Sequence, residues 1–466
     1  MLSKKVSLES ITPSDQYHDL SHSGRFLTKS VPKYQLPDES LPSKTAYQLV
    51  HDELMLDGNP RLNLATFNTS WMEEEADRLL TETAPKNYVD QDEYPQSTEI
   101  QNRCVNMIAH LFHAPDRGEG VGTATVGSSE AIHLCGLSLK WKWRNRRHAA
   151  GLPADKPNLV MGHNVQVCWE KFARYFEVEP RYVPLAEDRY VLGVDEALEM
   201  VDENTIGVVG ILGSTYTGEY EPISELNDAL TKLNEKTGWA VPIHVDAASG
   251  GFVAPFVTPD LLWDFRLPLV KSINVSGHKY GLVYPGVGWA IWRDKDQLPE
   301  DLVFHVNYLG GDQPTFNLNF SRGAGQIIAQ YYNFLRLGRE GYTRIMKSLA
   351  ENAKYVADKL TGSGLFTMLS KEKQLPVLAF SLVDDSRYTV FDISERLRER
   401  GWIVPAYTMA PNIEHIAVLR VVIRESFSRD LADLLLSDIE HAIKTLESGK
   451  ATSEQPHPKK KSHGTC

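Results

Sequence analysis

The stretch Ser272-Ile-Asn-Val-Ser-Gly-His-Lys-Tyr-Gly281 carries a lysine just beyond a short apolar run. Lysine is rarely buried in a protein unless it is paired or has a function. In open α/β sheets, the ends of buried strands are where ligands bind and chemistry takes place. Lys279 is therefore a candidate to form a Schiff base with a carbonyl cofactor or substrate. The alternative is a surface lysine that merely follows a strand.

A second stretch, Val241-Pro-Ile-His-Val-Asp-Ala-Ala-Ser-Gly-Gly251, has the same pattern of a short apolar run that ends in an acid and small residues. Asp246 precedes Lys279 by 33 residues, which is long enough for a crossover between neighbouring parallel strands. Pyridoxal phosphate (PLP) needs a lysine for its aldehyde and an acid for its pyridinium nitrogen. The pair at this spacing is more specific for PLP than either residue alone.

The segments His244-Val-Asp-Ala-Ala248 and Ser276-Gly-His-Lys279 resemble the PLP-dependent amino-acid decarboxylases of fold type I. The longer stretch Asn274–Trp289 is similar to glutamate decarboxylases of the bacterial and plant type, and the similarity extends from about Pro37 to about Glu447. The resemblance implies α-decarboxylation of L-glutamate to γ-aminobutyrate and CO₂. Each turnover would consume a proton, so the resemblance also implies a role in acid resistance.

The chain pattern agrees with an α/β fold. Strands alternate with helices through residues 61–340, which predicts a large PLP-binding domain with a mostly parallel central sheet. Residues 341–449 predict a smaller C-terminal α+β domain, so the whole is consistent with PLP-dependent fold type I. We expect residues 1–60 to form an N-terminal arm and helix, and residues 450–466 to form a flexible tail.

The cofactor phosphate is expected at Ser128 and Ser129, where small residues lead into a helix. Backbone N–H groups and the helix dipole make such a turn an anion site, although an ordinary serine N-cap has the same appearance. Next to Lys279, His278 is expected to act in catalysis by contacting the phosphate or lying near the ring, or else only to pack. The resemblance implies further cofactor contacts from Gln166, Thr215, Ala248, Ser276 and Ser321.

Two of these assignments have simple alternatives. Gln166 opens a predicted helix and, from the sequence alone, is better explained as a solvent-facing residue. Ser321 matches the serine with which family members reach the cofactor phosphate of a partner subunit, and its alternative is a helix cap. If Ser321 has the family role, a homodimer is the smallest active unit, and a hexamer built as a trimer of dimers is the larger alternative.

The substrate is expected to contact four residues. The resemblance places Thr66, Phe67 and Asp90 against the distal carboxylate of glutamate; the alternative for Asp90 is a turn residue or helix cap. An aspartate beside a carboxylate requires one of the two to hold a proton, which predicts an acidic working pH. Arg420 interrupts an apolar strand and can bind a carboxylate bidentately, or it can form an internal ion pair. Arg424 shares its face, and the sequence assigns it no role.

Composition limits the other partners and the setting. The net charge of −12, from 49 basic and 61 acidic residues, disfavours nucleic-acid binding. The four cysteines show no paired spacing, which favours a reduced cytoplasmic setting. No apolar run is long enough for a membrane span or signal peptide, so membrane association is not required. We expect no metal site.

The polar tail has no tryptophan and no apolar helical stripe, so we expect no calmodulin binding. His463 is a candidate regulatory residue, because some bacterial family members close their site at neutral pH with a histidine near the C-terminus. Here Gly464-Thr-Cys466 extends beyond it, a departure from that pattern.

Three other functions stay open. The first is a PLP-dependent decarboxylase of another amino acid, which Arg420, Asp90 and Thr66 disfavour because they suit a dicarboxylic substrate. The second is a non-catalytic PLP-fold assembly protein, which Asp246 and Lys279 disfavour. The third is an aminotransferase, which would release a keto acid rather than CO₂.

Overall fold

The computed structural model describes residues 32–38, 40–115, 119–308, 311, 313–371 and 374–448. The chain divides after Pro60 into two compact units. The described part of the first unit contains α1 (Ser43–Leu54), and all that follows concerns the second unit, from Arg61 onward. Most of the predicted arm and the predicted tail with His463 lie outside the described residues, so their roles stay predictions.

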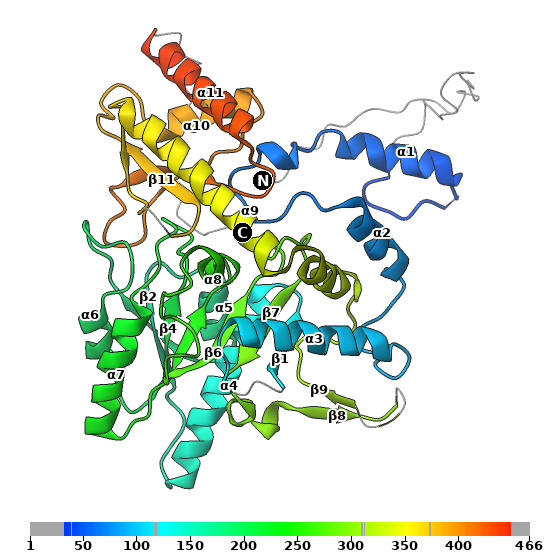
Figure 1. The fold of residues 1–466 in the computed structure, drawn as a ribbon, viewed down its shortest axis with the longest axis vertical. Helices are drawn as coiled ribbons and strands as arrows, with labels where there is room; N and C mark the ends of the chain where they lie inside the picture. Colours follow the sequence, from blue (N-terminus) through cyan, green and yellow to red (C-terminus); the bar gives the residue numbers. More distant parts are fainter. Residues whose placement is uncertain are drawn as a thin grey trace. The chain divides into compact units, whose positions relative to one another are not determined.

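A seven-stranded sheet forms the centre of the second unit (Figure 1). Its strands, in spatial order, are β1 (Val121–Thr125), β7 (Gly288–Trp292), β6 (Val270–Val275), β5 (Ile243–Asp246), β4 (Thr205–Ile211), β2 (Asn158–Gly162) and β3 (Glu179–Val183). Only β7 runs antiparallel to its neighbours β1 and β6. The predicted mostly parallel α/β sheet is therefore confirmed.

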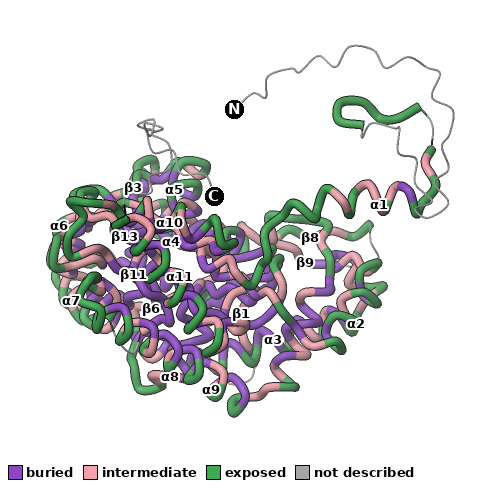
Figure 2. Tube along the Cα trace, turned by 90° about the horizontal axis from the view of Figure 1, so that it is seen from above, coloured by how far each residue is buried: buried purple, intermediate pink, exposed green. Residues whose placement is uncertain are grey.

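Helices cover both faces of this sheet. The helices of this part are α2 (Glu74–Thr83), which packs on α9, then α3 (Pro95–Leu111), α4 (Ser128–Ala149), α5 (Val167–Tyr175), α6 (Val194–Glu199), α7 (Ile223–Thr237), α8 (Ala254–Val257) and the first part of α9 (Gly325–Gly362). Alternate residues of β2 pack into different clusters: Leu159 and Met161 join a cluster with α4 and α5, whereas Val160 joins the main core. Figure 2 shows the buried residues concentrated on the strands and the exposed ones along outer helices such as α6 and α7. Burial on both faces is what a parallel sheet requires.

The longest helix, α9, leads into a smaller C-terminal part. It breaks at Gly338, which has the positive φ of 55°, a conformation that glycine adopts at little cost. The C-terminal sheet is antiparallel, in the order β10 (Phe366–Met368), β11 (Val377–Leu382), β13 (Ala417–Val422) and β12 (Ala406–Thr408). It is accompanied by α10 (Val390–Glu399) and α11 (Arg429–Glu447). A short hairpin, β8 (Phe304–Val306) and β9 (Gln313–Thr315), lies apart from both sheets. The predicted α+β part is thus present.

The start of α4 is fixed by a close approach of two backbones. Gly127, with φ 81°, precedes the helix, and a Cβ added to Gly288 of β7 would stand 2.5 Å from the Gly127 carbonyl carbon and 2.7 Å from the Ser128 nitrogen. Glu130 in the first turn, and Arg146 and other basic residues in the last, complement the helix dipole. The turn of residues 127–129 is therefore held rigidly against β7.

Replacing Gly288 with alanine is expected to push this turn away from β7. Overpacking of this kind costs about 1–3 kcal/mol, so Gly288→Ala should lower the midpoint of thermal unfolding. The matched control is Gly362→Ala at the end of α9, where an added Cβ meets nothing within 4 Å. Equal midpoints for the two variants would contradict this account of the turn.

Candidate active site

The turns that follow the strands of the central sheet enclose a cavity of about 250 Å³. It is lined by nine of the ten predicted cofactor-binding residues, namely Ser128, Ser129, Gln166, Thr215, Asp246, Ala248, Ser276, His278 and Lys279. These residues come from five separate segments of the chain. The fold therefore brings together what the sequence shows only as scattered small and polar residues.

Lys279 lies in the turn after β6, and its Nζ donates to the Ser249 hydroxyl at 3.1 Å. The same nitrogen stands 5.1 Å from the ring centre of Phe67. Burial lowers the pKa of Lys279, while the negative charge of Asp246 acts in the opposite direction. A lysine whose pKa is lowered offers more of its neutral amine, which is the nucleophilic form.

Asp246 is held in one orientation by three donors. Trp169 Nε1 donates to one carboxylate oxygen at 2.8 Å, and the Asn274 side-chain amide and the Ala248 N–H donate to the other at 3.0 and 3.1 Å. The side chain is nearly buried. A fixed acid at the end of β5 can hold a ring nitrogen that approaches through the cavity.

A buried histidine supports this acid through Asn274. His244 bonds through Nε2 to Asn274 Oδ1 and through Nδ1 to the Ser272 hydroxyl, both at 2.8 Å. Because the Asn274 amide nitrogen donates to Asp246, its oxygen must accept, and His244 must donate through Nε2. Burial lowers the pKa of His244 to about 4, so the ring is neutral at pH 7. Sequence reasoning missed His244, Asn274 and Trp169 as site residues.

The part of the cavity at the start of α4 can hold an anion. Ser128 and Ser276 share a hydroxyl–hydroxyl hydrogen bond of 2.7 Å at the start of α4, where free N–H groups point outward. The His278 ring packs so closely on this turn that a Cβ on Gly127 would stand 3.0 Å from its Cε1. Burial and the neighbouring Lys279 lower the pKa of His278 to about 4.

Two predicted substrate residues lie beside Lys279. The guanidinium of Arg420 stands between the rings of Phe67 and Tyr407, at 5.3 and 5.6 Å from their centres. It donates to the carbonyls of Thr215 and Ala65, both at 2.6 Å, and its Nε has no acceptor in the described part of the chain. Among the described residues Arg420 forms no ion pair, so the alternative of an internal ion pair is not observed. Thr66, next to Phe67, accepts from the Asn68 N–H at 3.2 Å.

The cavity lining includes neither Thr66, Phe67 and Arg420 nor the other two predicted residues, Asp90 and Ser321. They lie near each other instead: the Asn87 side chain donates to Ser321 at 3.4 Å, and the Asn87 carbonyl accepts from the Asp90 N–H at 3.2 Å. Ser321 is exposed, and α9 begins only at Gly325, so it is not a helix cap. The two residues form a separate group on the same chain.

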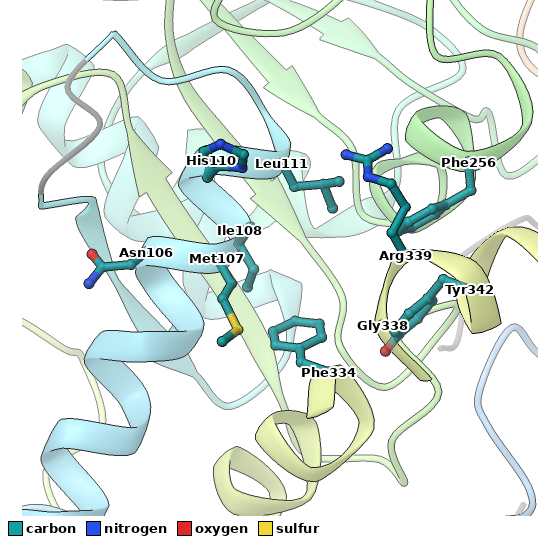
Figure 3. Close-up of a pocket in the computed structure, with 10 residues that line it drawn as sticks. All are labelled: Asn106, Met107, Ile108, His110, Leu111, Phe256, Phe334, Gly338, Arg339 and Tyr342. Carbon is teal, nitrogen blue, oxygen red and sulfur yellow. The ribbon is translucent and has the colours of Figure 1, made fainter. Parts of the chain in front are cut away.

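A larger cavity, of about 370 Å³, lies between α3, α8 and α9 beside the Gly338 break (Figure 3). Its walls are mostly apolar, with side chains such as Met107, Phe256, Phe334 and Tyr342. It shares no lining residue with the Lys279 cavity and contains none of the predicted site residues. Size alone therefore does not identify the reactive site. The described residues include no helix able to cross a membrane and no cluster of potential metal ligands.

A family model described as the pyridoxal-dependent decarboxylase conserved domain matches residues 32–383. The chain belongs to this family. It is 62% identical to a glutamate decarboxylase of Solanum lycopersicum over 445 residues, which cover 95% of the chain and 89% of the relative. It is 50% identical to a glutamate decarboxylase of Aliivibrio fischeri over 432 residues, 92% of the chain and 93% of the relative. The solved glutamate decarboxylase of Lactobacillus brevis superposes with a TM-score of 0.88 at 47% identity, covering 91% of this chain and 97% of that one.

The cofactor of the family, PLP, fits the residues present. The cavity offers an amine on Lys279, a fixed carboxylate on Asp246 and an anion-binding turn at Ser128. These are the three groups that an aldehyde, a pyridine nitrogen and a phosphate require. The enzyme is a PLP-dependent decarboxylase.

The buried His244 should make the protein less stable in acid. Its folded pKa of about 4 lies below the ordinary value near 6.5. The unfolded chain thus binds a proton in this range that the folded protein does not, and unfolding becomes easier as the pH falls from about 6.5 to about 4. His278 acts in the same direction.

In His244→Gln, the loss of stability on acidification should be shallower than in the wild type by up to about 1.4 kcal/mol per pH unit. The measurement is the denaturation midpoint between pH 7 and pH 4, and the exposed His148→Gln serves as control. If the curves of wild type and His244→Gln run parallel, the proposed neutral state of this histidine is wrong.

Proposed function

We propose that this enzyme removes the α-carboxylate of L-glutamate, releasing CO₂ and γ-aminobutyrate. The observation that carries the proposal is the cavity that holds Lys279 and Asp246, with Phe67 between the two cations: the Lys279 Nζ and the Arg420 guanidinium lie 5.1 and 5.3 Å from the Phe67 ring centre. The high identity to glutamate decarboxylases over nearly the whole chain supports it. A PLP-dependent decarboxylase of another amino acid is the second candidate.

Each residue of the cavity has a proposed task toward the cofactor. When bound, PLP supplies an electron-withdrawing ring that accepts the electron pair left at Cα as CO₂ departs. Lys279 binds the cofactor aldehyde, Asp246 holds the ring nitrogen protonated, and Ser128 and Ser129 hold the phosphate. The remaining contacts to the ring and phosphate come from Gln166, Thr215, Ala248, Ser276 and His278.

We assign to Lys279 a second task, the return of a proton to Cα. Its Nζ has one described hydrogen-bond partner, Ser249, and burial lowers its pKa. An amine of this kind exchanges a proton more readily near neutral pH than an exposed lysine does. Each turnover takes up a proton, which supports a role in acid resistance.

Selection of glutamate is proposed to depend on its two carboxylates. Arg420 uses two of its N–H groups on backbone carbonyls and retains others for one carboxylate. Thr66, Phe67 and Asp90 favour the other, and the pairing of Asp90 with a carboxylate favours an acidic working pH. The two sets of contacts together thus disfavour an amino acid without a second carboxylate.

We propose that Asp90 and Ser321 serve the cavity of a partner subunit. Their grouping around Asn87, away from the Lys279 cavity, supports this assignment. The active unit would then be at least a homodimer, with a hexamer as a trimer of dimers the larger possibility. A cytoplasmic setting is supported by the free, buried thiols of Cys104, Cys135 and Cys168.

The direct test of the function is to incubate the purified protein with PLP and L-glutamate at about pH 4.5 and about pH 7, with CO₂ and γ-aminobutyrate as readouts. Equimolar products are expected at acid pH, and none from Lys279→Ala. Bound PLP without product from glutamate, but with CO₂ from another amino acid, would support the second candidate instead.

Mixed oligomers test the sharing of residues between subunits. Lys279→Ala and the double variant Asp90→Ala, Ser321→Ala should each be nearly inactive alone. A mixed dimer should have one complete cavity, made from Lys279 of one subunit and Asp90 and Ser321 of the other, so a co-expressed equal mixture should regain about a quarter of wild-type activity.

The control is a mixture of the two variants that were expressed and purified separately, under conditions in which their subunits do not exchange. Activity no higher than the sum of the separate variants would mean that Asp90 and Ser321 act on their own chain.

A further inference from the structure

Residues 63–70 form a loop that joins the C-terminal part of the enzyme to the Lys279 turn. At one end, the Leu64 N–H donates to the Ile403 carbonyl at 2.9 Å and its carbonyl accepts from the Val422 N–H at 3.0 Å. At the other end, Thr69 donates through its N–H to the His278 carbonyl at 2.9 Å and through its hydroxyl to the Lys279 carbonyl at 2.8 Å. The 63–70 loop therefore connects directly to the backbone of the reactive lysine.

One buried arginine, Arg424, binds both ends of the 63–68 segment of this loop. Arg424 is 2% exposed. It donates through Nη2 to the Asn63 carbonyl at 2.9 Å and through Nη1 to the Asn68 carbonyl at 2.5 Å. The two acceptors flank Thr66 and Phe67, the residues that face the substrate in the proposed function. The planar, rigid fork of an arginine can fix two such acceptors relative to each other.

The loop has other anchors that do not involve Arg424. Ser70 donates through its N–H and its hydroxyl to Glu425, at 2.8 and 3.0 Å, and Arg420 holds the Ala65 carbonyl. Both ends of the loop also keep their backbone bonds. Loss of Arg424 should therefore loosen residues 63–68, the arc of the loop that carries Phe67, without releasing the whole loop.

We infer that Arg424 is a positioning residue for substrate selection. It joins the two ends of the arc at residues 63–68 and so holds Phe67 and Thr66 at the place where the distal carboxylate of the substrate is selected. Both Nη atoms of Arg424 donate to backbone carbonyls of the loop, so it acts through the loop rather than on the reacting atoms. The inference rests on the proposed function, because it names what sets the specificity of that site.

The test compares two substrates that differ only in the distal carboxylate, L-glutamate and L-norvaline. In Arg424→Lys, which keeps the charge but loses the fork, the ratio of kcat/KM for glutamate to that for norvaline should fall about tenfold. The loss should be mainly in KM for glutamate, with bound PLP and its visible absorbance unchanged. Arg424→Gln, which keeps a single donor group, should show the same direction.

The matched control is Arg293→Lys. Arg293 also donates to backbone carbonyls, those of Phe265 and Leu267 at 2.8 and 3.1 Å, but far along the chain from the 63–70 loop. Its substitution can lower thermal stability and should leave the glutamate-to-norvaline ratio unchanged.

Two outcomes would overturn the inference. One is a parallel loss of activity toward both substrates with the ratio unchanged. The other is loss of bound PLP or of folding in both Arg424 variants, which would mean that the residue holds the fold rather than the arc. The wild-type ratio reports separately on the proposed function: a wild type that does not prefer glutamate refutes that function, whatever the variants do.

Discussion

The site depends on the pairing of two parallel strands in one register. In the pairing of β5 with β6, His244 lies opposite Ser272 and Asp246 lies opposite Asn274. These are the same pairs that hydrogen-bond through their side chains, at 2.8 and 3.0 Å. A slip by one residue would turn each side chain to the other face of the sheet. The register therefore fixes the acid, and the turn after β6 then places Lys279 within the same cavity.

A second set of interactions brings distant segments to this sheet edge. Arg420 within β13 and Arg424 just beyond it donate to carbonyls of the 63–70 loop. Burying two guanidinium groups is costly unless their donors are used, and backbone carbonyls supply the acceptors. The C-terminal part thus places a cation beside the Phe67 ring and also holds the 63–70 loop. In the proposed function, selectivity and reactivity come from different parts of the chain, which meet at Phe67.

Much of this arrangement could be predicted from the sequence, because strand ends with small residues have a distinctive pattern. Asp246 is the last residue of its strand, Lys279 and Ser128 follow the ends of theirs, and all three line one cavity. His244 and Asn274 had a usable signal, since each lies two or five residues before a predicted site residue in a stretch already singled out. Trp169 had none, because its contact with Asp246 depends on how α5 packs.

The antiparallel direction of β7 and the role of Arg424 also depend on contacts between segments far apart in the chain. The placement of Asp90 and Ser321 away from the cavity could not be read from local patterns either.

The central claim is that Lys279 holds the carbonyl cofactor within this cavity. Borohydride reduction of the holoenzyme fixes PLP to the amine that carries it, and peptide mass spectrometry then locates the label. The account predicts a phosphopyridoxyl group on the peptide that contains Lys279, and no such label in Lys279→Ala. A label on a different lysine, or PLP bound without any label, would contradict it.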